Sequence, residues 1–170
     1  MTTGPSWHFL EAVAVMIICL SAGKAAADCT EGAAPKVNWH RCLLDNRSLP
    51  QVDLTAAMLR EASFLRSDLS GASLKESDAY RAKFVSAKLV GTVFDGARLI
   101  DADFSRADLN GASFRSADLR SARFYAANLQ GANLTEARLD RADLRNASLT
   151  GATWTDGIHI CAAPSIGQCN

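Results

Sequence analysis

The sequence is dominated by a five-residue period. From Leu54 to Trp154 every fifth residue is apolar, and of these 21 positions only Ala79 is not Leu, Phe or Trp. The residue two places earlier is small, and alanine fills 17 of the 21 places. A typical unit is residues 107–111, ADLNG.

This spacing excludes both regular secondary structures. On an α-helix, five residues advance about 140° beyond a full turn, so the apolar side chains would spiral around every face. On a flat strand, an odd spacing would send successive leucines to opposite faces. A chain that turns a corner every five residues keeps all of them inside, and corners near 90° would close one coil every four units.

The glycines show the coil length independently. Five of the six glycines in the periodic region recur every twenty residues, and Gly96 departs from the series. The recurring set is Gly71, Gly91, Gly111, Gly131 and Gly151. We interpret these glycines as marking the same corner of successive coils, where the backbone takes a conformation that other residues cannot adopt. The sequence therefore predicts an all-β parallel solenoid of about five coils, spaced about 4.8 Å apart.

The outward positions carry charges that alternate from coil to coil. One predicted column reads Asp78, Arg98, Asp118, Arg138. Stacked opposite charges contribute only about 0–1 kcal/mol per exposed pair, but their alternation avoids like-charge repulsion. On the inside, Ala79 replaces a leucine, so we expect a small void there or an inward shift of Tyr80.

The array resembles the pentapeptide-repeat family, whose consensus A-(D/N)-L-x-G it follows almost unit by unit across residues 50–155. The resemblance implies a right-handed quadrilateral β-helix. More loosely, residues 29–42 are similar to the N-terminal segment of exported bacterial members. A solenoid must also cover its terminal coils, so residues 28–49 are predicted to form an N-terminal cap, 50–155 the β-helix and 156–170 a C-terminal cap.

Residues 1–27 are predicted to be a cleavable signal peptide. Ala12–Ala22 is an apolar run too short to span a bilayer, and Ala25–Ala27 offers a cleavage site before Asp28. The leading segment contains no Lys or Arg, so a retained membrane anchor is the alternative. With cleavage after Ala27, the mature protein is expected to be periplasmic or secreted, without stable membrane insertion.

Four cysteines remain after such cleavage, and an even number in an exported chain favours disulfides. A rod about 25 Å long, from a coil spacing of about 4.8 Å, cannot bring its ends within the ~7 Å that a disulfide requires between Cα atoms. The predicted pairs are therefore local, Cys29–Cys42 and Cys161–Cys169. Free thiols, or a zinc site at Cys29, His40 and Cys42, are the alternatives.

No catalytic, cofactor or metal site is predicted. His40 and His159 fall in opposite caps, and no histidine stands in the array to activate a serine. The glycines are spaced rather than clustered, so no phosphate-binding loop is expected. The sequence predicts a protein that is not an enzyme and has no cofactor.

Two binding roles are weighed. Leu65, Val85 and Tyr125 share one outward column and are the predicted protein-interaction patch of a monomer or weak dimer. The alternative is a cytoplasmic DNA mimic that protects topoisomerases, as known members of the resembled family do. A mimic requires a surplus of carboxylates, but the array has 14 basic and 13 acidic residues. The sequence therefore disfavours a DNA-mimic function, and no nucleic-acid binding is expected.

Overall fold

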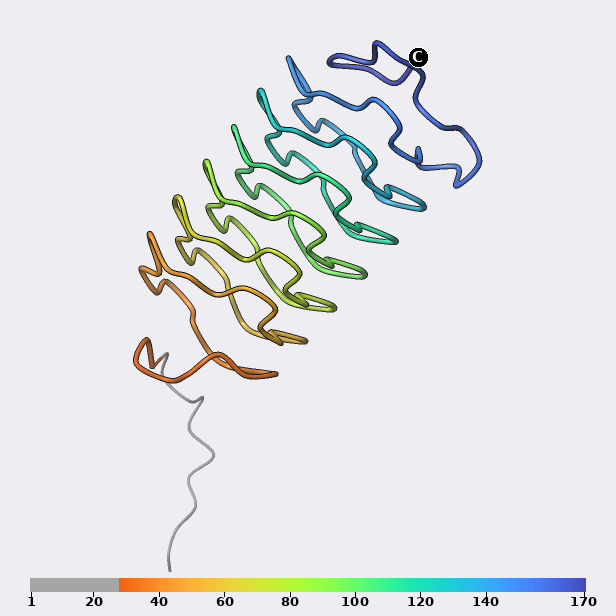
Figure 1. Cartoon of the computed structure of the whole chain (residues 1–170). Coiled ribbons are helices and arrows are strands. Elements are labelled where there is room, and N and C mark those ends of the chain that lie inside the picture. The colour runs from red at the N-terminus through yellow and green to blue at the C-terminus, as the bar shows by residue number, and fades with distance from the viewer. Residues whose placement is uncertain (1–27) are drawn as a thin grey trace, which may run out of the picture.

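Each turn of the chain lies parallel on the turn before it, with partners twenty residues apart. The computed structural model describes residues 28–170, and the predicted signal peptide lies outside them. Parallel bridges connect one residue on each side of a coil to its counterpart twenty residues later, from Asn38↔Met58 to Asn133↔Thr153. The result is a four-sided rod of stacked coils (Figure 1). Within residues 28–170 the chain has no helix, and its bridges are isolated single residues rather than longer strands.

The β-helix is longer than the sequence indicated. On the first face the bridges join six rungs, not five. These rungs are Asn38, Met58, Asp78, Arg98, Asp118 and Arg138. Residues 38–49 thus belong to the first coil, and the predicted cap over 28–49 is wrong in this part. The start was missed because the small inward places of this coil hold Val37, Cys42 and Arg47 instead of alanine.

The corners share one backbone conformation, and this corrects the interpretation of the glycines. At each corner a four-residue turn is closed by a hydrogen bond such as Ala57 N–H to the Leu54 carbonyl (3.0 Å). The third turn residue has positive φ on all four sides, and 18 non-glycine residues adopt it, with Ala56 at 56°. Positive φ costs an L-residue about 1–2 kcal/mol, so glycine relieves a strain common to every corner.

Phenylalanine rings stack along the axis of the rod. Phe64, Phe84, Phe104 and Phe124 form one column, with centroids of neighbouring rings 4.9–5.2 Å apart and nearly parallel. Phe94 and Phe114 stack in the adjoining column at 4.9 Å, and the two columns meet edge to face. The stacking follows from the spacing between coils, about 4.8 Å, which sets the distance between identical side chains on neighbouring coils. All six rings are fully buried.

The two ends are covered by short irregular segments, each tied by a disulfide. At the N-terminal end, Cys29 pairs with Cys42 (Cα–Cα 5.4 Å). At the C-terminal end, Cys161 pairs with Cys169 (4.8 Å). Both pairs match the local connectivity expected from the length of the rod. Among the described residues, no helix has the length and apolar character needed to cross a membrane.

Candidate functional sites

The predicted interaction patch is divided by a serine. Leu65 and Val85 occupy the same corner on neighbouring coils, where the Arg66 N–H donates to the Val85 carbonyl (3.1 Å). Ser105 occupies this corner on the next coil, and Tyr125 follows one coil further on. Leu65 and Val85 are half-buried, whereas Tyr125 is 43% exposed. The geometry groups the first two residues and leaves the tyrosine apart.

Tyr80 lies in a cluster that the sequence analysis missed. Its ring has three guanidinium carbons within 5.1 Å of its centroid, those of Arg60, Arg81 and Arg98. Asp78 pairs with two of these arginines. Tyr80 therefore packs against outward-facing cations and does not shift inward over the fully buried Ala79. The twenty-residue register places Arg60 in the same column as Tyr80, but the approach of Arg81 and Arg98 depends on side-chain directions that the sequence does not give.

Ion pairs between coils follow the predicted alternation of charge. Arg98 approaches Asp78 at 3.1 Å, and Lys88 approaches Asp68 at 3.3 Å, each twenty residues away. Arg123–Asp103 and Arg138–Asp118 continue the pattern at 3.5 and 3.9 Å. These side chains are partly or largely exposed, so each pair contributes about 0–1 kcal/mol. Each of these four carboxylates is thus matched by a base one coil away.

The shifted carboxyl pKa values point away from acid–base catalysis. Hydrogen bonds from Arg145 lower the pKa of Asp143 to about 2. The pKa of Asp118 is also lowered, chiefly by the side chain of Arg120. The pKa of Asp68 falls because the Ser70 hydroxyl and N–H donate to it. A general acid needs a carboxyl pKa raised by burial, and these carboxylates are held in the ionised form.

The remaining candidate ligands and catalytic residues are dispersed. His40 lies at a corner of the first coil, and His159 follows the last coil, at the opposite end of the rod. Cys29 and Cys42 are joined to each other, so their sulfurs are not free thiolates for zinc. Over residues 28–170, no group of three or more His, Cys, Asp or Glu side chains is arranged to hold a metal ion.

Comparison with known families agrees with the geometry. Models described as "Pentapeptide repeats (8 copies)" and "Pentapeptide repeat region" match residues 40–76 and 77–154 respectively. The chain belongs to the pentapeptide repeat family. The matched span reaches into the first coil, in agreement with the bridges. The fold of this family is the right-handed quadrilateral β-helix, and its members are scaffold-like and generally non-catalytic.

Solved pentapeptide repeat structures are similar to this one. HetL of the cyanobacterium Nostoc, a protein involved in heterocyst differentiation regulation, is 30% identical and superposes with a TM-score of 0.48. The match covers 72% of this chain and 63% of HetL. A protein of the Arabidopsis thaliana thylakoid lumen is 29% identical, with a TM-score of 0.43 and coverages of 63% and 68%. QnrB1, a plasmid-mediated fluoroquinolone resistance protein, is 22% identical, with a TM-score of 0.50 and coverages of 66% and 62%.

This chain thus spans less than two-thirds of HetL and of that QnrB1 chain. The likeness to QnrB1 shows the fold alone. A search of curated proteins gave no match.

Proposed function

We propose that this pentapeptide repeat protein is an exported, non-catalytic scaffold that binds another protein through an exposed face of its rod. The observation that supports export best is the closure of both ends by local disulfides. Structural disulfides persist in oxidising compartments and are rare in the cytosol. The proposed compartment is the periplasm or the extracellular space, after removal of residues 1–27.

The proposed binding face centres on Leu65 and Val85. They lie on neighbouring coils of a rigid surface, and Tyr125 stands in the same column two coils beyond Val85, separated from it by Ser105. Aromatic and aliphatic anchors on a rigid support lose little conformational entropy on binding. The proposed oligomeric state is a monomer or weak dimer, in which this face stays open for a different protein.

The alternative function is that of a cytoplasmic DNA mimic that protects a topoisomerase. A mimic must present a dense surplus of negative charge. The columns of this rod instead pair carboxylates with arginine or lysine one coil away, as in Asp78–Arg98. The paired charges favour the scaffold over the mimic.

Mass spectrometry of the protein isolated from its native host separates the two functions. We expect a mature N-terminus at Asp28 and a mass that includes two disulfides. An intact Met1 together with four reduced thiols in residues 28–170 would contradict export and favour the cytoplasmic alternative.

A pull-down from envelope extract tests the binding face. We expect the double variant Leu65→Lys/Val85→Lys to lose a partner that the wild-type protein retains. Ile158→Lys is the matched control, because Ile158 is 85% exposed and lies at the C-terminal end, away from this corner. Retention of the same partner by the double variant would exclude this face.

A further inference from the structure

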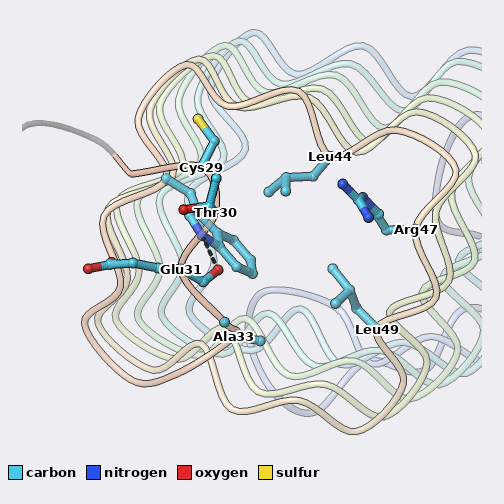
Figure 2. A pocket seen from close by; sticks show the side chains of 9 residues that line it. Cys29, Thr30, Glu31, Ala33, Leu44, Arg47 and Leu49 are labelled. Carbon is cyan, nitrogen blue, oxygen red and sulfur yellow. Dashed lines mark hydrogen bonds between the residues drawn. The ribbon is translucent and has the colours of Figure 1, made fainter.

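The N-terminal end of the rod contains a cavity that the protein-binding face does not use. Its volume is about 360 Å³, within the range of small-molecule pockets. Figure 2 looks into this end and shows Leu44, Arg47 and Leu49 on one side of the opening. Residues 29–33 cross the other side. Among residues 28–170, the terminal segment thus covers part of the first coil and leaves the rest as an open mouth lined by Trp39, Leu44, Arg47 and Leu49.

The walls of the mouth are largely apolar. Trp39 and Leu44 are core residues, only 2% and 5% exposed, and Leu49 is half-buried. The Trp39 indole N–H donates to the Glu31 carbonyl (3.2 Å), which fixes the ring against the crossing segment. Trp39 and Leu44 therefore form an ordered floor of the mouth with little exposed area, and Leu49 offers a ligand the larger apolar contact.

Arg47 places a positively charged side chain beside this apolar surface. In the register of the repeat it stands two residues before Leu49, at the inward place that alanine normally fills. Its main chain is held by Ser67, whose hydroxyl accepts the Arg47 N–H (3.0 Å) and donates to the Leu44 carbonyl (2.7 Å). Ser67 also replaces the usual alanine, so two departures from the repeat meet at this site.

The guanidinium of Arg47 is available for a ligand. Within residues 28–170, no carboxylate lies within ion-pair distance of it, whereas Arg41 and Arg81 each pair with an acid one coil away. Glu31 also lines the mouth, but Figure 2 shows its carboxylate directed away from Arg47. The mouth therefore offers one unpaired positive charge beside apolar walls.

We infer that the N-terminal mouth binds a small carboxylate with an apolar body. The carboxylate accepts hydrogen bonds from the Arg47 guanidinium, which suits planar, two-pronged contact with such a group. The apolar body lies against Trp39, Leu44 and Leu49. This site is independent of the proposed protein-binding face and of export.

The test uses octanoate as the probe and the Trp39 indole N–H resonance as the reporter, assigned with Trp39→Phe. In the full chain, we expect octanoate to shift this resonance saturably, and octanol at the same concentrations to bind at least tenfold more weakly. Arg47→Ala removes the charge and restores the small residue of the repeat. It is expected to weaken octanoate binding at least tenfold while the protein stays folded, and Arg47→Lys should retain part of the affinity.

Arg106→Ala is the matched control, since Arg106 is exposed and lies on a different coil, far from the mouth. It should bind octanoate as the wild type does. The inference is overturned if octanoate leaves the Trp39 resonance unmoved, or if Arg47→Ala binds as tightly as the wild type. It is also overturned if sedimentation velocity shows a stable dimer and that dimer does not bind octanoate.

Discussion

The two ends of the rod are covered in different ways. A terminal coil exposes unpaired backbone groups and core side chains, which invite association with other chains. At the N-terminal end the first coil keeps the parallel register, and residues 28–33 cross its opening. At the C-terminal end the chain reverses, and antiparallel bridges join Thr153 to Ile160 and Ser148 to Ile166.

The reversal covers only two of the four faces. On the other two, Leu139 and Leu144 stay half-buried, and their N–H groups donate no hydrogen bond within residues 28–170. The N-terminal crossing instead buries Trp39 almost completely and leaves a cavity beside it. The comparison shows that a short cap can either close a few faces tightly or span the opening and leave room beneath it.

The largest expected difference between the ends concerns their tryptophans. Trp39→Ala should lower the free energy of unfolding by about 3–5 kcal/mol, the usual cost of removing a buried tryptophan. Trp154 is only half-buried, so Trp154→Ala should cost about 1–2 kcal/mol because less apolar area is lost. Urea denaturation of both variants measures the difference. Equal losses would mean that the N-terminal end is no better closed than the other.

The disulfides should stabilise the two ends by similar amounts. They close segments of 13 and 8 residues, for which loop entropy gives about 3 and about 2.5 kcal/mol. Cys29→Ser/Cys42→Ser and Cys161→Ser/Cys169→Ser should each lower stability by about these amounts. Denaturation of each double variant, compared with the wild type under reducing and non-reducing conditions, checks this. A stability change confined to one pair would show that only one end limits unfolding.

Two buried serine hydroxyls, one near each end, should make smaller contributions to the free energy of unfolding. Ser165 donates to the Ala162 carbonyl and accepts from the Asn170 N–H (3.1 Å), which secures the C-terminal residue. Ser165→Ala should cost about 1–2 kcal/mol. Ser67→Ala should cost about 0.5–1 kcal/mol, since alanine fits the repeat but loses two hydrogen bonds. Amide hydrogen exchange should locate the loosening at the matching end, and loosening elsewhere would contradict these roles.

The smallest expected effect is acid sensitivity shared by both ends. Hydrogen bonds from Thr30 lower the pKa of Asp28, and the N–H groups of His159 and Ile158 lower the pKa of Asp156. A carboxyl whose pKa is lower in the folded state stabilises it above the ordinary pKa, near 3.8. That stability disappears as the pH falls through the lowered value.

The melting temperature should therefore fall modestly below about pH 4, a limit set by the ordinary aspartate pKa. Asp28→Asn and Asp156→Asn keep an acceptor oxygen but cannot titrate, so each should flatten this decline. Differential scanning calorimetry from pH 2 to 6 measures the slopes. A steeper fall of the melting temperature with decreasing pH in either variant would contradict this role of the carboxylates.

Much of the rod could be predicted from residue spacing. The leucine and phenylalanine period, and the recurrence from Gly71 to Gly151, were sufficient for four-sided coils of twenty residues. The first coil was not predicted, because Cys42 and Arg47 occupy places where alanine marks the repeat elsewhere. The glycine corner was misread, because sequence alone does not show that Ala56 and the other corner residues adopt the same positive φ.

The candidate sites were less accessible to sequence reasoning. The column of Leu65, Val85 and Tyr125 follows from the period, and their shared corner appears in the structure. The Tyr80 cluster depends on side-chain directions, because Arg60, Arg81 and Arg98 approach the ring from three coils. The mouth depends on where the chain crosses before the first coil, and no periodic pattern covers residues 28–33.

The sequence by itself determined the interior of this protein, its coil length and the alternation of its surface charges. A strict period leaves one closed path that buries every fifth side chain, so local spacing is sufficient there. Only the tertiary structure decided the reversal after Thr153, the closure over Trp39 and the exposure of Arg47 at the open end. At the ends the repeat stops, and the path is set by disulfides and single hydrogen bonds between non-repeating residues.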